Sequence, residues 1–169
     1  MESKTMSPSA LVSQSPRGWK RWLFRAPIVL YRLGLGWLLG GRFVLIHHIG
    51  RSSGLPRQVV VEIAGHDADS NTYYVVSGWG YKSNWYRNLM AQPDTTIQVG
   101  RRSLSVHAET LSPEAGTEVL IAYRKAHQFA ANELGSLMGL DIGHASADQL
   151  KSFVRESLPV VAFRPRENA

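Results

Sequence analysis

Two arginines bracket a short turn-forming segment in the first third of the chain. The segment runs from Arg51 to Arg57 and reads Arg-Ser-Ser-Gly-Leu-Pro-Arg. A Ser-Ser-Gly turn between strands exposes backbone N–H groups, and two flanking arginines can close on a phosphate with bidentate hydrogen bonds. The pattern predicts an anion site, although a polar hairpin turn with solvated arginines accounts for the same residues.

A second segment joins a strand-like run to a glycine loop and a short helix. The run Tyr74–Ser77 leads into Gly78-Trp79-Gly80, and residues 84–93 contain Trp, Asn and a closing Pro. Glycines let a flat ring approach the backbone closely, and a helix N-terminus favours an anion. The segment therefore predicts a place for a flat, negatively charged ligand.

Other site chemistries find little support in the sequence. The chain has no cysteine, which excludes disulfides, Cys-ligated metals and thiol nucleophiles. His47 and His48 are adjacent on a predicted strand, so their side chains point to opposite faces and cannot share a metal. We expect one of them to lie in the core and the other to face a cavity or solvent. A calcium-loop pattern begins at Asp67 but lacks the required Gly and Glu, and no triad-like serine or carboxylate pair is evident.

The positive charge is concentrated at one end of the chain. The 169 residues carry a formal net charge of +6, and residues 1–60 hold nine Lys and Arg against one Glu. An anionic ligand, a phosphate-bearing cofactor or a membrane surface could use such a patch. The length suits one domain, and 44% apolar residues are typical of a globular protein.

The hydrophobic pattern predicts a small antiparallel barrel. Strands are expected at residues 43–49, 58–63, 72–77, 95–99, 103–109 and 159–163. Helices are expected at residues 84–91, 112–127 and 147–156, with residues 129–144 irregular or partly helical. Strands in meander-like order with helices at the ends and between them favour a mainly β fold over a βαβ sheet. We expect a disordered tail at 1–16, a helical segment at 17–41 and the barrel at 42–166.

The helical segment at residues 17–41 is amphipathic. Its aromatic face carries Trp19, Trp22 and Trp37. Its basic face carries Arg21, Arg25 and Arg32. Three roles stay open: packing on the barrel, reversible contact with a membrane surface, or one wall of a substrate pocket. No transmembrane span, signal peptide or nucleic-acid-binding module is predicted. We expect a cytoplasmic protein, with peripheral membrane contact open.

In their order and spacing, the two segments resemble the deazaflavin-dependent nitroreductase family, whose members are split β-barrels that use coenzyme F-420. The family pattern is R-x-S-G-x-x-R between strands, a V-A-S-type strand end with a glycine loop, and W-Y-x-N-L-x-A-x-P. The matching residues here are 51–57, 75–77 and 85–93, and residues 158–163 resemble the family's closing strand. The resemblance covers roughly residues 20–165 and implies a six-stranded split β-barrel, similar to FMN-binding barrels.

The resemblance also implies roles for particular residues. The group expected to hold the cofactor's phosphate and acidic tail is Arg51, Ser52, Ser53, Gly54 and Arg57. The group expected to line the deazaflavin ring is Val76, Ser77, Gly78, Trp79 and Gly80, with Trp85 and Asn88 supporting that loop. The glycine loop is shorter than in many members, so Trp79 either stacks on the ring or intrudes on its site.

The activity that the resemblance implies is hydride transfer from reduced coenzyme F-420 to an organic substrate. The exposed aromatic surface expected here suits an apolar substrate that is flat or lipid-like. Candidates for a proton donor are Tyr31, Tyr86, Tyr123 and His127, although a structural role is favoured for each. Two alternatives stay open: an FMN reductase with the flavin phosphate on the same arginines, and a non-catalytic carrier of a fatty acid, other lipid or cofactor. The protein is expected to be a monomer or a homodimer, with no metal and no nucleic-acid partner.

Overall fold

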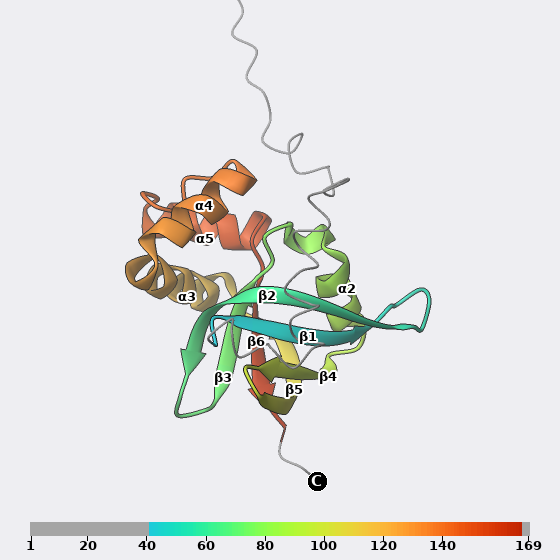
Figure 1. The fold of residues 1–169 in the computed structure, drawn as a ribbon. Helices are drawn as coiled ribbons and strands as arrows, with labels where there is room; N and C mark the ends of the chain where they lie inside the picture. Colours follow the sequence, from blue (N-terminus) through green and yellow to red (C-terminus); the bar gives the residue numbers. More distant parts are fainter. Residues whose placement is uncertain (1–40, 167–169) are drawn as a thin grey trace, which may run out of the picture.

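Six antiparallel strands close into a barrel in the computed structural model, which describes residues 41–166 (Figure 1). The strands are β1 (Phe43–Ile49), β2 (Pro56–Asp67), β3 (Thr72–Val76), β4 (Asp94–Val99), β5 (Arg102–Thr110) and β6 (Val160–Pro165). Around the barrel the hydrogen-bonded order is β1-β2-β3-β6-β5-β4, with β4 pairing β1 to complete the circle. The six-stranded barrel with flanking helices confirms the expected fold class.

The strand order differs in one respect from the meander expected from the sequence. β1, β2 and β3 form one meander, and β4, β5 and β6 form another. The two meanders join through β3–β6 and β1–β4 pairing, so β3 is not followed around the barrel by β4. The reason is the connection after β3, which carries the chain through a helix across the barrel and delivers β4 beside β1.

Five helical segments complete the described part of the chain. They are η3 (Gly80–Lys82), α2 (Asn84–Ala91), α3 (Pro113–Ala126), α4 (Gln128–Met138) and α5 (Ala147–Glu156). Ser112 caps α3 by accepting a hydrogen bond from the N–H of Ala115, and Pro113 occupies the first turn. Ser146 and Gln149 form a capping box at the start of α5. The expected helical segment at 17–41 lies outside the described residues, except for Gly41.

One hydrophobic core fills the barrel. Inward-facing residues of the strands, among them Val44, Ile46, Val75, Ile97 and Phe163, pack together and are fully buried. Trp85 and Leu89 of α2 belong to the same core, so α2 is anchored to the barrel by its apolar face. Each such side chain contributes about 1.5–3 kcal/mol on burial, which fixes where α2 lies relative to β1.

A second core joins the outer face of the barrel to helices α3, α4 and α5. Its fully buried members include Leu120 of α3, Leu150 of α5 and Val160 of β6. Gly116 permits the close packing of these elements, because a Cβ there would lie 2.8 Å from Val154 Cγ1. The three helices form one layer on one side of the barrel (Figure 1). None of the helices within residues 41–166 is both long and apolar enough to span a membrane.

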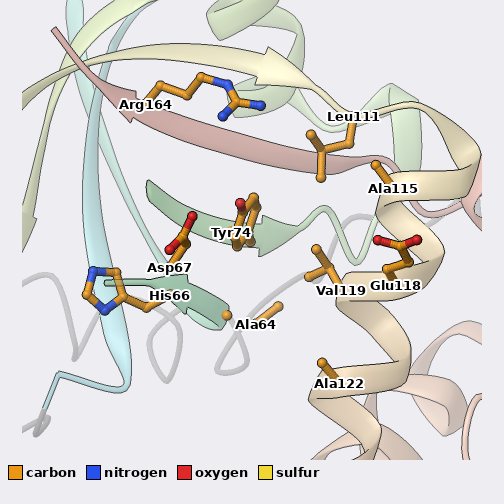
Figure 2. Close-up of a pocket in the computed structure, with 11 residues that line it drawn as sticks. Ala64, His66, Asp67, Tyr74, Leu111, Ala115, Glu118, Val119, Ala122 and Arg164 are labelled. Carbon is orange, nitrogen blue, oxygen red and sulfur yellow. The ribbon is translucent and has the colours of Figure 1, made fainter. Parts of the chain in front are cut away.

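An outward-facing cavity of about 360 Å³ lies between α3 and strands β2 and β3 (Figure 2). Small and aliphatic side chains form much of its wall, including Ala64, Leu111 and Val119. Asp67, Glu118 and Arg164 supply charged groups in the lining. The sequence had not indicated this cavity, because its walls come from elements far apart in the chain.

Candidate cofactor-binding site

The turn between β1 and β2 holds its shape through its own backbone. The N–H groups of Ser53 and Gly54 donate to the carbonyl of Gly50 at 3.1 and 2.7 Å, and the N–H of Gly50 donates to Leu55 at 2.9 Å. Gly54 has a φ of +65°, in the left-handed region that favours glycine. A Cβ on Gly50 would collide with Ser53 Oγ and lie 3.0 Å from Arg57 Nε. The glycines therefore allow the turn to fold tightly beneath an arginine.

A cavity of about 290 Å³ opens beside this turn, and we call it the anion cavity. Its lining residues come from β1, the turn, β2 and α2, and they are His48, Gly50, Arg51, Ser52, Ser53, Arg57, Asn84 and Asn88. Four of the five residues expected to hold the cofactor's phosphate and acidic tail line it together. Gly54 does not line it and instead shapes the turn.

Arg51 is held in place by two asparagines of α2. Its Nη1 atom donates to Asn88 Oδ1 at 2.9 Å and to Asn84 Oδ1 at 3.3 Å. The backbone N–H of Arg51 also donates to Asn88 Oδ1, at 3.1 Å. Asn84 and Asn88 are four residues apart, so they lie on the same face of the helix. The turn and α2 are thereby joined through one arginine, and Asn88 has a defined structural role at the cavity.

His48 completes the wall on the barrel side. It pairs across the strands with Arg57, so the two side chains lie on the same face of the sheet. The side chain of His48 is 8% exposed, and its Nδ1 atom lies 3.0 Å from the amide nitrogen of Asn88. Burial, followed by the positive charge of Arg57 and the nearby His47, lowers the pKa of His48 to about 4. His48 is therefore neutral at pH 7.

The anion cavity has the charge and the donors that a phosphate requires. Arg51 and Arg57 border it, and its lining, drawn from the described residues, contains no carboxylate. The hydroxyls of Ser52 and Ser53 add neutral donors. The backbone N–H groups of Gly50, Ser53 and Gly54 are used within the turn, and that of Arg51 donates to Asn88, in contrast to the exposed backbone donors expected from the sequence. The residues present fit the phosphate and acidic tail of a deazaflavin cofactor.

The glycine loop after β3 forms a separate feature that does not line the anion cavity. Ser77 is fully buried, and its hydroxyl donates to the carbonyl of Gly80 at 2.9 Å. Gly80 has a φ of +69°, and a Cβ there would lie 2.8 Å from the carbonyl oxygen of Ser157. Trp79 is 42% exposed at the tip, whereas Val76 lies at the buried strand end. The loop is thus closed by its own hydrogen bonds and presents an indole at the surface.

Helices α4 and α5 support the glycine loop from behind. A Cβ on Gly78 would lie 3.4 Å from Leu134 of α4, and the hydroxyl of Tyr81 donates to the carbonyl of Val154 in α5 at 3.1 Å. The backbone N–H of Ser77 donates to Pro159, which precedes β6. The loop therefore depends on a segment that is distant in sequence. Trp85, expected to support the loop, is 7% exposed and packs in the barrel core.

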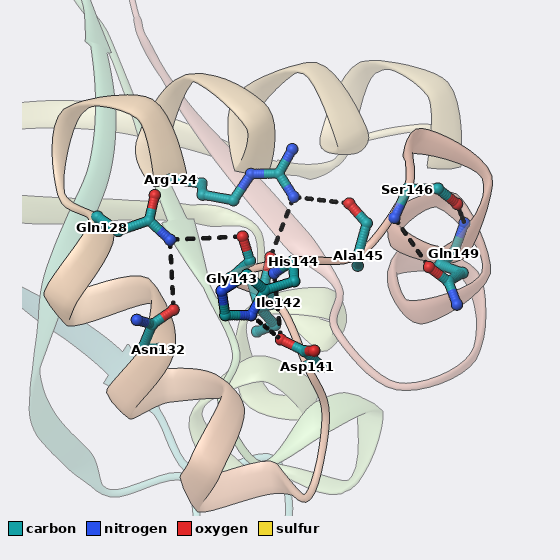
Figure 3. A network of polar contacts seen from close by, with 10 residues as sticks. All are labelled: Arg124, Gln128, Asn132, Asp141, Ile142, Gly143, His144, Ala145, Ser146 and Gln149. Atoms are coloured by element: carbon teal, nitrogen blue, oxygen red, sulfur yellow. Dashed lines mark hydrogen bonds and ion pairs between the residues drawn. The ribbon is translucent and has the colours of Figure 1, made fainter.

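The connection between α4 and α5 is fixed by a polar network (Figure 3). Nη1 of Arg124 donates to the carbonyls of Ile142 and Ala145, at 3.2 and 2.7 Å. Gln128 donates to the carbonyl of Gly143, and Asp141 accepts from His144. Gly139 ends α4 with a φ of +67°. The network holds α4 and α5 in the arrangement that supports the glycine loop.

The candidate proton donors are engaged in structural contacts. Burial and the Glu62 carboxylate raise the pKa of Tyr123, and its hydroxyl is hydrogen-bonded to Glu62. The hydroxyl of Tyr86 lies 2.9 Å from Thr110 Oγ1. The ring of His127 lies 5.7 Å from that of Tyr123. Tyr31 lies outside the described residues. None of the three described candidates lines the anion cavity.

Three lining residues were not assigned to the site from the sequence: His48, Gly50 and Asn84. His48 could have been found from the strand register, because it is the cross-strand partner of Arg57 in the β1–β2 hairpin. Asn84 could have been found from its spacing of four residues from Asn88. Gly50 gives no signal beyond its place beside Arg51.

The chain is similar to proteins that use reduced coenzyme F-420. A profile of the F(420)H(2)-dependent quinone reductase family matches residues 31–132. A Mycobacterium tuberculosis protein, provisionally named an F(420)H(2)-dependent quinone reductase, is 28% identical over 138 residues, covering 80% of this chain and 99% of that protein.

Solved structures share the fold at low sequence identity. An F(420)H(2)-dependent reductase termed FDR-A has a TM-score of 0.50 and 21% identity, covering 73% of this chain and 94% of that one. The heme storage protein HutZ of Vibrio cholerae has a TM-score of 0.52 and 11% identity, covering 86% and 92%. A chain described as a domain-swapped dimer has a TM-score of 0.53 and 20% identity, covering 87% and 100%.

The profile match covers more than half of the chain and includes both segments that carried the family resemblance. The chain therefore belongs to the F(420)H(2)-dependent quinone reductase family, a family of deazaflavin-dependent oxidoreductases whose cofactor is coenzyme F-420.

Proposed function

We propose that this protein transfers a hydride from reduced coenzyme F-420 to an apolar organic substrate of the quinone class. The observation that carries the proposal is the anion cavity, where two arginines and a Ser-Ser turn meet without a carboxylate in the lining. The family name and the name of the M. tuberculosis relative support the cofactor and the quinone class.

In this proposal the β1–β2 turn holds the charged end of the cofactor. Arg51 and Arg57, with the hydroxyls of Ser52 and Ser53, bind the phosphate and acidic tail, and Gly54 shapes the turn that carries them. The hydrogen bonds from Arg51 to α2 set the position of its guanidinium before the ligand arrives. Such preorganisation lowers the entropy lost on binding.

The glycine loop is the proposed ring site. Of the five loop residues expected at the ring, Gly78 and Trp79 reach the surface and would contact it, above the buried Val76, Ser77 and Gly80. Trp85 anchors α2 in the barrel core, and Asn88 lies at the anion cavity. When bound, the reduced deazaflavin supplies the hydride, and a quinone that accepts it with one proton becomes a quinol. The chain's own contribution is to orient the two molecules and exclude water.

Exposed apolar side chains support an apolar substrate. Trp79 is 42% exposed on the glycine loop, and Phe129 is 78% exposed on α4, the helix that supports that loop. An aromatic side chain exposed at the proposed ring site offers a flat apolar surface to a ring or substrate. We propose that Trp79 stacks on the ring or the substrate, and that Trp79→Ala therefore weakens binding of one of them.

The deciding experiment follows oxidation of reduced coenzyme F-420 by a soluble quinone such as menadione, without oxygen, with FMN tested in parallel. We expect substrate-dependent oxidation that the purified wild-type protein catalyses and Arg57→Ala slows. Turnover with reduced FMN alone would favour an FMN reductase. Tight binding of F-420 without turnover of any quinone would favour a carrier.

A further inference from the structure

A buried histidine at the anion cavity has one nitrogen already occupied. The Nδ1 atom of His48 lies 3.0 Å from the amide nitrogen of Asn88, while the amide oxygen of Asn88 accepts from the backbone N–H and the Nη1 of Arg51. Two donors on the oxygen fix which way the Asn88 amide points. Its NH₂ group must therefore donate to His48, so Nδ1 is an acceptor without a proton.

The remaining nitrogen of His48 must then carry the proton. A neutral imidazole has one N–H, and with Nδ1 acting as acceptor this N–H is at Nε2. No fully buried side-chain nitrogen among the described residues lacks a hydrogen-bond partner. The hydrogen bond of His48 is made by Nδ1, not by Nε2. Nε2 is therefore not fully buried and stays in contact with solvent, and the residue lines the anion cavity.

We propose that His48 is a third donor to the anion in this cavity, through its Nε2–H, and that Asn88 positions it by fixing the tautomer. The proposal rests on the anion site of the proposed function and adds to it a binding residue, His48, that lies outside the segment Arg51–Arg57. The chain of donors runs from Arg51 to Asn88 to His48 to the anion. Arg57, the cross-strand partner of His48, approaches from the same face of the sheet.

Two substitutions distinguish anion binding by His48 from a purely structural role of this residue. Gln can place an N–H near the position of Nε2, whereas Asn can place only an acceptor near that of Nδ1. His48→Gln should keep most of the affinity for inorganic phosphate. His48→Asn should lose about ten- to a hundredfold, as expected for one hydrogen bond to a charged group. His47→Asn, next in the chain and on the opposite face, is the matched control and should bind as the wild type does.

The spectroscopic test uses the full chain labelled with ¹⁵N. Long-range ¹H–¹⁵N correlation, assigned with His48→Gln, should show the His48 proton on Nε2 at pH 7, and added inorganic phosphate should shift that resonance. A proton on Nδ1, or equal phosphate affinity of the Gln and Asn variants, would overturn the proposal. Phosphate binding lost in Arg57→Ala but retained in His48→Asn would also overturn it.

The same titration distinguishes this proposal from the proposed function. If phosphate shifts His48 but coenzyme F-420 does not compete with it, the inference stands and the proposed function fails. If phosphate moves neither His48 nor any resonance that Arg57→Ala affects, the anion site itself is refuted and both fail.

Discussion

At the scale of single residues, Arg51 and Arg57 have different contacts, although the sequence pattern predicted the same role for both. Arg51 donates to two asparagines of α2, whereas Arg57 lies on β2 opposite a neutral histidine. A substitution at Arg51 therefore removes a link between two elements as well as a charge. Arg57 contributes more simply, as a guanidinium at the edge of the anion cavity.

Replacing either arginine should weaken binding of coenzyme F-420. Loss of a charge-assisted hydrogen bond predicts about a ten- to hundredfold lower affinity for Arg57→Ala and for Arg51→Ala. Lys should rescue only partly, because a point charge cannot reproduce the planar fork. Fluorescence titration at two salt concentrations measures the effect, with the exposed Arg102→Ala on β5 as control. Equal affinity in the wild type and both cavity variants would contradict the assignment.

The depressed pKa of His48 predicts a particular dependence of stability on pH. The pKa of His48 is about 4 in the folded protein, against an ordinary value of 6.5, so between these pH values the unfolded chain binds more protons. His48 therefore lowers the free energy of unfolding as the pH falls from about 6.5 to 4, by up to about 3 kcal/mol. Arg57, His47 and Arg51 lie around it, and none of them supplies a negative charge to oppose this.

Denaturant unfolding of the wild type and His48→Gln between pH 7 and pH 4 checks the prediction. The wild type should lose more stability than the variant over this range, since Gln does not titrate. Parallel curves for the two proteins would show that His48 is not kept neutral by the fold. Carboxylates with lowered pKa values, such as Asp94 and Asp141, are common to both proteins and cancel in the comparison.

At the scale of elements, the glycine loop depends on the segment that follows α5. Gly80 approaches the carbonyl of Ser157, and the N–H of Ser77 donates to Pro159. The loop therefore takes its shape from residues about eighty positions later in the chain. Any change that moves the end of α5 should alter the proposed ring site without touching its residues.

Gly80→Ala should destabilise the protein more than Gly100→Ala. Both glycines have positive φ, +69° and +57°, which costs a residue with a Cβ about 1–2 kcal/mol. Only at Gly80 would the Cβ meet backbone, at 2.8 Å from Ser157, whereas Gly100 has nothing within 4 Å. Urea unfolding should give a loss of about 2–4 kcal/mol for Gly80→Ala. Similar losses in the two variants would show that the loop can shift away from Ser157.

The elements formed from local patterns were predictable, and their pairing was not. The limits of β1, α2 and α5 match the expected residues, because periodicity and caps lie within each segment. β2 extends to Asp67 instead of ending at Ile63, through a register shift between Ile63 and Gly65 that lets it pair with β3. The gathering of His48, Asn88 and Arg51 depends on the position of α2 on the barrel, which no local pattern encodes.

At the scale of the whole molecule, β6 joins the two meanders. It pairs with β3 on one side and β5 on the other, and Phe163 at its centre is fully buried in the barrel. The helices of the outer layer pack on the same strand through Val160. The barrel core and the outer core therefore meet at one strand, and we expect them to unfold together.

Phe163→Ala should cost about 3–5 kcal/mol, because the cavity left in the barrel core cannot be filled by neighbours held in closed strands. Circular dichroism and tryptophan fluorescence should still report one coincident unfolding transition. The milder Phe163→Leu should retain the fold and lose less. Two separate transitions in the wild type would show that the barrel and the helical layer are independent units.

The order of the strands along the chain also has a consequence during synthesis on the ribosome. Strands β3, β2, β1 and β4 are neighbours in the barrel, and all four, with α2 and the turn that contains Arg51, precede residue 100. The anion cavity can therefore assemble on a nascent four-stranded sheet before the barrel exists. The outer edge of β3 then stays unpaired, and can pair with other chains, until β6 is synthesised about sixty residues after the end of β4.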